Sequence, residues 1–145
     1  MENTGKALKF KHRVRARWAE CDPQGLVFNA RYLDYFEIVQ AEYFRELGIN
    51  IYSPETLKTF AYVVRGAELE FRAPVQVDEE IDLCMGVTSM GRSSISATMT
   101  VEHAATGETA FASNLLLVNF DSEAVTSRPV PDWVRSKIEA HEGIG

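Results

Sequence analysis

The sequence predicts an α+β protein in which a five-stranded antiparallel sheet wraps around one long central helix. One strand-like segment occurs before a single long helical segment and four occur after it, and the first of them alternates apolar and polar residues. That segment, residues 29–47, contains no proline or glycine and has too many apolar residues for a helix on a surface. Because a single antiparallel sheet needs its apolar face covered, we expect the sheet to enclose this helix.

The first strand is predicted over residues 9–18, KFKHRVRARW. We expect one face of it to be buried, with side chains from Phe10, Val14, Ala16 and Trp18. The opposite face is basic and is expected to be solvated; it carries Lys9, Lys11, Arg13, Arg15 and Arg17. The strand ends at ECDPQG, residues 20–25, where proline and glycine are typical of a turn.

The central helix is predicted to begin at Asn29, a favourable N-cap residue, and to end before Gly48, a favourable stop. Steps of three or four residues place one apolar set on the same face: Tyr32, Phe36, Val39, Tyr43 and Leu47. A second set widens that face: Leu33, Ile38, Ala41 and Phe44. The width of this apolar surface is the reason for expecting the sheet to surround the helix.

The remainder of the chain is predicted as a loop, four strands and a short helix. Residues 50–58 form the loop, and the strands cover about residues 60–72, 80–90, 93–103 and 108–121. The turns between them, APVQVDE, SMGRS and AATGE, are short and polar, so we expect consecutive strands to pair antiparallel. Residues 131–141 form an amphipathic helix with Trp133, Val134 and Ile138 on its apolar side.

Composition narrows the function classes. The 145 residues suit one domain, residues 1–145, and the net charge of −6 argues against a nucleic-acid partner. Neither a membrane-spanning run nor the apolar core of a signal peptide is visible, so no membrane partner is expected. Cys21 and Cys84 belong to no CxxC or Cys/His cluster. We therefore expect no metal and no cofactor, and two reduced thiols in a cytoplasmic protein.

The segment CDPQGLVFNARYLDYFE, residues 21–37, together with the element order, resembles the hotdog-fold acyl-CoA thioesterases. The most similar group is the 4-hydroxybenzoyl-CoA thioesterase family with its short-chain acyl-CoA relatives. The shared motif is Asp22, Gly25 three residues later, two apolar residues, an aromatic residue and a helix that begins at Asn29. YVVRGAELEFRAPVQVDEEI and SMGRSSI also match, and the resemblance runs from about residue 10 to residue 121.

This resemblance implies hydrolysis of an acyl-CoA thioester without a metal. It also implies a homodimer as the minimal unit, often paired into a homotetramer, with sheets joined edge to edge and active sites between subunits. Asp22 is the implied catalytic residue, as nucleophile or as the base that holds the attacking water. The backbone amide at Asn29 is implied to polarise the carbonyl, since first-turn amides lack intrahelical partners. Relatives often carry His or an aromatic residue at this position, so the Asn29 side chain has no assigned role.

The implied substrate contacts are Gly25, Tyr32, Tyr62, Val63 and Val64 around the acyl group, and the turn Gly91, Arg92, Ser93 and Ser94 near the CoA phosphates. A guanidinium, hydroxyls and free amides suit a phosphate, although an exposed hairpin tip explains the same turn equally well. Tyr32, like Tyr35 and Phe36, also fits a purely core position.

The sequence is also compatible with several alternatives. Asp22 opens an Asp-Pro pair, which is typical of an Asx-turn, and Cys21 beside it is a weaker nucleophile candidate because no histidine is near in sequence. A different branch of hotdog thioesterases uses a helix carboxylate, a position that Asp34 or Glu37 would take. The alternative functions are an acyl-carrier-protein thioesterase and a non-catalytic acyl-CoA binding module. A hydratase is disfavoured because the central helix contains no histidine.

Overall fold

The computed structural model describes residues 7–145, so residues 1–6 of the predicted single domain lie outside the described part. Its elements, in chain order, are β1 (Phe10–Arg15), η1 (Trp18–Glu20), η2 (Asn29–Arg31), α1 (Tyr32–Glu46), α2 (Pro54–Leu57), β2 (Tyr62–Phe71), β3 (Glu80–Met90), β4 (Ser94–His103), β5 (Thr109–Asp121), β6 (Thr126–Ser127) and α3 (Asp132–Glu142). The α+β prediction and the five long strands are confirmed.

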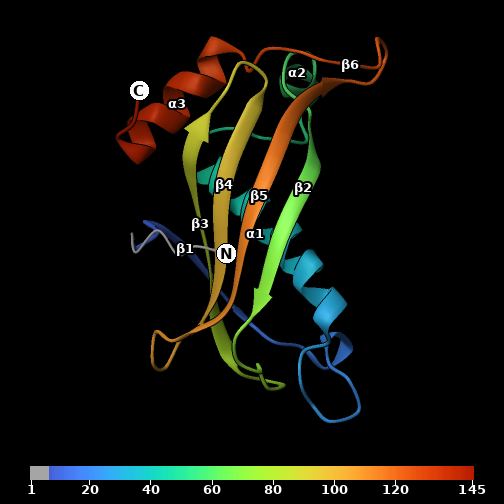
Figure 1. The fold of residues 1–145 in the computed structure, drawn as a ribbon, viewed down its shortest axis with the longest axis vertical. Coiled ribbons are helices and arrows are strands. Elements are labelled where there is room, and N and C mark those ends of the chain that lie inside the picture. Colours follow the sequence, from blue (N-terminus) through green and yellow to red (C-terminus); the bar gives the residue numbers. More distant parts are fainter. Residues whose placement is uncertain (1–6) are drawn as a thin grey trace.

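The strands form one curled antiparallel sheet in the order β1-β3-β4-β5-β2, and short β6 pairs with β5 (Figure 1). The hairpins β3–β4 and β4–β5 pair as expected. The expected pairing of β2 with β3 is wrong, because β2 pairs with β5, from Tyr62 opposite Asn119 to Phe71 opposite Phe111. The segment after β2 therefore crosses to the far side of the sheet, and β2 is left at an edge.

Helix α1 lies against one face of the sheet (Figure 1) and buries the predicted apolar face, with Tyr32, Phe36, Val39 and Tyr43 at 5% exposure or less. The sheet does not enclose the helix completely, since Leu33 on its other side is 50% exposed. A five-stranded sheet curls only part of the way around a helix, so one side of α1 stays open. Gly48 has a φ of +79°, which confirms the predicted stop.

The predicted N-cap at Asn29 is wrong. A 3₁₀ turn, η2, precedes α1, and Phe28 occupies its N-cap position without a side-chain hydrogen bond. Residues 50–58 are also more ordered than the expected loop. Ser53 caps the short helix α2 by accepting a hydrogen bond from the Thr56 amide at 3.2 Å, and Pro54 begins this helix.

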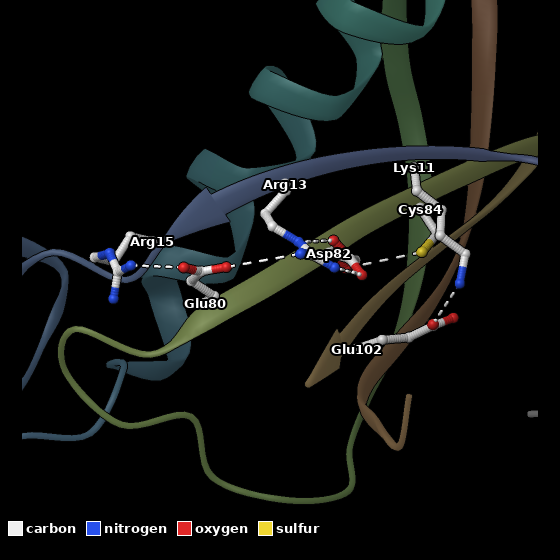
Figure 2. A network of polar contacts seen from close by, with 7 residues as sticks. All are labelled: Lys11, Arg13, Arg15, Glu80, Asp82, Cys84 and Glu102. Carbon is white, nitrogen blue, oxygen red and sulfur yellow. Dashed lines mark hydrogen bonds and ion pairs between the residues drawn. The ribbon is translucent and has the colours of Figure 1, made fainter. Parts of the chain in front are cut away.

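The predicted basic face of β1 is exposed, but carboxylates of the neighbouring strands neutralise it (Figure 2). Lys11 Nζ lies 2.9 Å from Glu102 Oε1, and Arg13 Nε lies 3.0 Å from Asp82 Oδ1. Arg13 lowers the pKa of Asp82, through a hydrogen bond and through its charge. The expected burial of Trp18 is wrong: β1 ends at Arg15, the alternation stops there, and Trp18 in η1 is 69% exposed.

Helix α3 covers the predicted tail within one residue and buries Val134 and Ile138. The expected burial of Trp133 is only partial, because its ring is 39% exposed. None of the helices in the described part of the chain is long and apolar enough to cross a membrane.

Candidate active site

Asp22 lies in a tight turn between η1 and η2, and one of its carboxylate oxygens holds that turn together. Asp22 Oδ1 accepts hydrogen bonds from the amides of Gln24 at 2.8 Å and Leu26 at 3.2 Å. The backbone closes the same turn, since the Asp22 amide donates to the Leu26 carbonyl at 2.8 Å. The Asx-turn interpretation is therefore correct for Oδ1. Oδ2 accepts no hydrogen bond from residues 7–145, which leaves it available for chemistry.

Gly25 shapes this turn through its backbone. Its φ of +80° is in the left-handed region, its amide donates to the Asp22 carbonyl at 2.9 Å, and its own carbonyl accepts from the Val77 amide at 2.8 Å. It is absent from the residues that line the pocket around Asp22. Its hydrogen bonds are those of a turn residue, and a contact between Gly25 and the substrate stays a prediction.

Gly25→Ala is expected to lower the free energy of unfolding by about 1–2 kcal/mol, because an L-residue is strained at this φ. Urea denaturation would measure the loss. Gly66→Ala is the control, since Gly66 has no positive φ and nothing lies within 4 Å of an added Cβ. Equal free energies of unfolding for the two variants would show that alanine adopts the left-handed conformation at residue 25 without strain.

The start of the helical segment presents free amides beside Asp22. The amides of Asn29 and Ala30 have no acceptor among residues 7–145, whereas the Arg31 amide already donates to the Phe28 carbonyl at 2.9 Å. Unpaired first-turn amides and the helix dipole favour negative charge at this point. The Asn29 side chain is exposed and makes no hydrogen bond within the described part of the chain.

A pocket of about 300 Å³ joins these groups. Its wall contains Asp22, Asn29 and Tyr32, which the sequence predicted as site residues, and it is completed by Leu26, Val27, Phe71, Arg72, Ala73 and Pro74. Tyr32 stacks on Phe111 with ring centroids 4.6 Å apart. Burial, with smaller contributions from Glu79 and Cys21, raises the pKa of Tyr32 to about 12, so its hydroxyl is neutral at physiological pH.

Glu20 is a buried carboxylate that sequence reasoning missed. It accepts hydrogen bonds from the Arg17 amide at 2.9 Å, from Arg17 Nε at 2.8 Å and from Tyr35 Oη at 2.9 Å. Its carbonyl also accepts from the Phe28 amide at 2.9 Å, so Glu20 ties both ends of the Asp22 turn to α1. Burial opposes ionisation, but the hydrogen bonds prevail and lower the pKa of Glu20.

Only part of this arrangement had a sequence signal. The Arg17 and Glu20 spacing of three residues hinted at a local ion pair, whereas nothing in the sequence linked Glu20 to Tyr35 on the helix.

Cys21 is unsuited to be the nucleophile. Burial, and then the charges of Glu20 and Asp22, raise the pKa of this thiol. Its Sγ lies 3.4 Å from the Arg17 carbonyl and has no histidine partner within residues 7–145. In the same part of the chain, no group of three or more His, Cys, Asp and Glu side chains is arranged to hold a metal ion.

A second cavity, of about 560 Å³, lies between α1, α2 and β2; we call it the α1–β2 groove. It is lined from α1 by Leu33, Phe36, Glu37 and Gln40, and from β2 by Tyr62, Val64 and Ala67. Tyr62 and Val64 thus lie on one side of the edge strand. Val63 alternates to the other side and lines neither this groove nor the Asp22 pocket. Asp34 pairs with Arg31 at 3.2 Å, while Glu37 faces the groove.

The turn Gly91–Ser94 is distant from Asp22 within the chain. The Asp22 turn contacts Val77, just before β3 begins, whereas Gly91 follows the end of β3. An eleven-residue strand separates these ends by about 33 Å. The Arg92 carbonyl accepts from the Val130 amide at 2.9 Å, and its guanidinium is exposed without a partner among residues 7–145.

Comparison with known proteins identifies relatives of this chain. A family model described as the thioesterase-like superfamily matches residues 16–138. The acyl-CoA thioester hydrolase YbgC of Escherichia coli O157:H7 is 28% identical over 97 residues, which cover 66% of this chain and 70% of that protein.

Solved structures agree with this relationship. A thioesterase from Thermus thermophilus, crystallised with coenzyme A and Zn, is 29% identical, with a TM-score of 0.78 over 93% of this chain and 95% of its own. A thioesterase-superfamily protein from Jannaschia sp. CCS1 has a TM-score of 0.83 at 22% identity, covering 97% and 96% of the two chains. The 1,4-dihydroxy-2-naphthoyl-CoA thioesterase Slr0204 from Synechocystis has a TM-score of 0.81 at 14% identity, covering 89% and 94%. The last two show the fold alone, and together these structures confirm the expected hotdog fold.

Proposed function

Because this chain belongs to the thioesterase-like superfamily, we propose that it hydrolyses an acyl-CoA thioester to the free acid and CoA, with Asp22 as the catalytic residue. The relatives support the reaction class, since one is named an acyl-CoA thioester hydrolase and another is a thioesterase crystallised with CoA. The assignment of roles to residues is supported by one observation. A carboxylate with one fixed and one free oxygen shares a pocket with Asn29, whose amide has no acceptor among residues 7–145.

Two routes use this geometry. In the first, Asp22 takes a proton from water as the water oxygen bonds to the thioester carbon. The resulting oxyanion accepts hydrogen bonds from the amides at Asn29 and Ala30, the C–S bond breaks, and Asp22 returns the proton to the CoA sulfur. In the second, Asp22 itself attacks, CoA leaves as the thiolate and takes a proton from solvent, and water hydrolyses the acyl–aspartate anhydride. Both routes end in the same products.

The test is release of free thiol from acetyl-, octanoyl-, palmitoyl- and benzoyl-CoA, with the same acyl groups on an acyl carrier protein as a second panel. Thiol release from CoA substrates is the expected result. Release only from the carrier protein would support the acyl-carrier-protein thioesterase. Saturable binding of acyl-CoA without thiol release would support the binding module instead.

We also propose that the active unit is a homodimer joined through β2, which pairs with β5 on one edge only and has no strand partner on the other within residues 7–145. Four of its apolar side chains are 42–48% exposed: Val63, Val64, Leu69 and Phe71. Antiparallel two-fold pairing of the β2 edges brings the Asp22 end of one subunit level with the Gly91–Ser94 end of its partner. In this arrangement, the CoA phosphates at one Asp22 site would be bound by Arg92 of the partner subunit. Two such dimers would form the implied homotetramer.

Leu69→Glu is expected to reduce the molar mass measured by light scattering to that of a monomer, because each copy of the joined edge would bury a charged side chain in place of an apolar one. Thiol release should fall with it. Val125→Glu, at an equally apolar but remote exposed position, is the control. An unchanged mass for Leu69→Glu would exclude this edge as the interface.

We place the protein in a reducing compartment, the cytoplasm. Both cysteines are free, and burial raises the pKa of the Cys84 thiol to about 12. Alkylation of unfolded protein taken rapidly from cells should find two reduced thiols. A disulfide in that sample would contradict this location.

A further inference from the structure

A carboxylate and an imidazole form a contact that the two routes of hydrolysis do not use. Glu79, the residue before β3, and His103, the last residue of β4, meet through Glu79 Oε2 and His103 Nδ1. Because a carboxylate accepts hydrogen bonds and does not donate them, the imidazole donates from Nδ1. The side chains of Glu79 and His103 are only 26% and 17% exposed, so water competes weakly for this contact. The contact therefore ties the segment before β3 to the β4–β5 hairpin.

Glu79 also closes the turn that leads into β3. Its Oε1 accepts from the Gln76 amide, and its own amide donates to the Gln76 carbonyl, both at 3.2 Å. Asp78, within this turn, has a φ of +69°, which is uncommon for a residue other than glycine and persists where the surroundings hold it. The side chain of Glu79 thus fixes the conformation of residues 76–79 and attaches them to His103.

The segment before β3 lies antiparallel to the turn that carries Asp22, and Leu26 pairs with Gln76 at its centre. Leu26 also holds Asp22, because its amide donates to Asp22 Oδ1 at 3.2 Å and its carbonyl accepts from the Asp22 amide at 2.8 Å. On either side of this pair, bonds of 2.8 Å run from the Val77 amide to the Gly25 carbonyl and from the Val27 amide to the Val75 carbonyl. A displacement of Gln76 would therefore move the residue on which the orientation of Asp22 depends.

The residues that this segment holds connect the two groups needed for hydrolysis. Residues 25–27 lie in the chain between the Asp22 carboxylate and the Asn29 amide. Burial, and to a smaller extent the charge of Glu79, raises the pKa of Tyr32, which lines the Asp22 pocket. Glu79 is therefore close enough to influence this pocket by its charge as well as through the backbone.

Strand β1 supports the same segment from its other side. The Ala16 amide donates to the Glu79 carbonyl at 2.9 Å, and the Ala16 carbonyl accepts from the Asp78 amide at 2.8 Å. Arg15 Nη1 donates to the Asp78 carbonyl at 2.7 Å. These bonds hold the end of the segment through its backbone, whereas the Glu79 side chain reaches back to Gln76. Loss of the contact with His103 is therefore expected to loosen the segment without unfolding the protein.

We propose that Glu79 and His103 are positioning residues for thioester hydrolysis, which hold the segment that sets the distance between the Asp22 carboxylate and the Asn29 amide. This inference rests on the proposed function. Neither side chain lines the Asp22 pocket, so both act through the backbone. A misplacement of reacting groups by about 1 Å can slow a reaction by about 100-fold, so a loosened segment should lower kcat more than it raises KM.

His103→Leu and Glu79→Ala each remove the contact, and each is expected to lower kcat for thiol release by about tenfold with little change in KM. His103→Asn should retain most of the wild-type kcat, because its amide nitrogen takes the place of Nδ1 and can donate to Glu79. The double variant should be no slower than Glu79→Ala alone, since one contact is lost in both. Fully additive losses would overturn the proposal, because they would show two independent structural effects.

Glu102→Gln is the matched control. Glu102 precedes His103 at the end of β4, and its side chain is also 17% exposed, but it pairs with Lys11 of β1 at 2.9 Å (Figure 2). This variant should therefore retain the wild-type kcat. A fall in kcat as large as that of His103→Leu would overturn the proposal, because any change at this end of β4 would then slow the reaction.

Amide hydrogen exchange tests the contact without hydrolysis. The amides of Val27 and Val77 form the bonds between the two segments, and in His103→Leu they should exchange about tenfold faster or more than in wild type. Glu79→Ala gives the same test from the other side of the contact, should His103→Leu not fold. Absence of thiol release from wild type would overturn the hydrolase assignment, whereas the contact is judged by exchange alone. Unchanged exchange of both amides, or a wild-type kcat in both variants, would overturn this inference.

Discussion

Asp22→Asn is expected to lower the rate of thioester hydrolysis by about 10²–10⁴-fold and to leave the fold nearly unchanged. Asparagine keeps an oxygen where Asp22 Oδ1 accepts from the amides of Gln24 and Leu26, so the turn is preserved. It removes the negative charge and the basic oxygen, which both routes of hydrolysis require. Initial rates of thiol release and urea denaturation of the same preparations would measure the two effects separately.

Asp121 provides a matched control for this variant. Its Oδ1 accepts from the amides of Glu123 at 3.0 Å and Ala124 at 3.2 Å, in a similar turn at the far end of β5. Asp121→Asn should therefore resemble Asp22→Asn in stability and retain wild-type activity. An Asp22→Asn protein that hydrolyses acyl-CoA at the wild-type rate would remove Asp22 from the mechanism.

Glu20→Gln is expected to destabilise the protein by about 2 kcal/mol at neutral pH, because a buried carboxylate with three donors loses its charge. The pKa of Glu20 is lower in the folded protein than in the unfolded chain. The ionised carboxylate therefore contributes its full share to the free energy of unfolding above the unfolded pKa of about 4.3, and this share is lost as the pH falls through the folded pKa. The stability difference between wild type and Glu20→Gln should therefore shrink below about pH 4.3. Urea denaturation over this pH range is the measurement.

Glu55→Gln is the control for the charge itself. Glu55 pairs with Lys58 at the same spacing of three residues, but its side chain is 84% exposed, and we expect Glu55→Gln to lower the free energy of unfolding by about 0.5 kcal/mol or less.

Tyr35→Phe removes the hydroxyl on α1 that donates to Glu20. A double-mutant cycle of this variant with Glu20→Gln gives the coupling energy between the turn and α1. Thiol release should also fall in Glu20→Gln, since the Asp22 turn is tied down by this contact. Equal losses in Glu20→Gln and Glu55→Gln would refute the role of Glu20.

Local patterns predicted the elements that local physics controls. The strand predicted over about residues 80–90 matched β3, and the helical spacing from Tyr32 to Tyr43 identified the buried side of α1. The predictions of the helix start and of the strand pairing were wrong, because both depend on residues that are distant in sequence and close in space. Helical propensity could not show that a 3₁₀ turn precedes Tyr32, and short connections could not show that β2 pairs with β5.

The candidate site also contains residues that the local sequence predicted and residues that only the fold brought together. Its carboxylate, turn glycine and helix start are contiguous, so the segment from Asp22 to Asn29 contained them all, and a family resemblance was visible there. The fold then showed that Asp22 both holds the turn and keeps one oxygen free. It also added Glu20, because the contact with Tyr35 joins residues 15 positions apart.

By itself, the sequence determined the α+β class, the five strands, the helix and the short segment with the candidate carboxylate, since each follows from spacing within a few residues. Only the tertiary structure decided that β2 lies at an edge of the sheet and that the Leu33 side of α1 remains exposed. The reason is physical: periodicity reports which side of an element is apolar, whereas strand order and exposure depend on how far a finite sheet can curl around its helix.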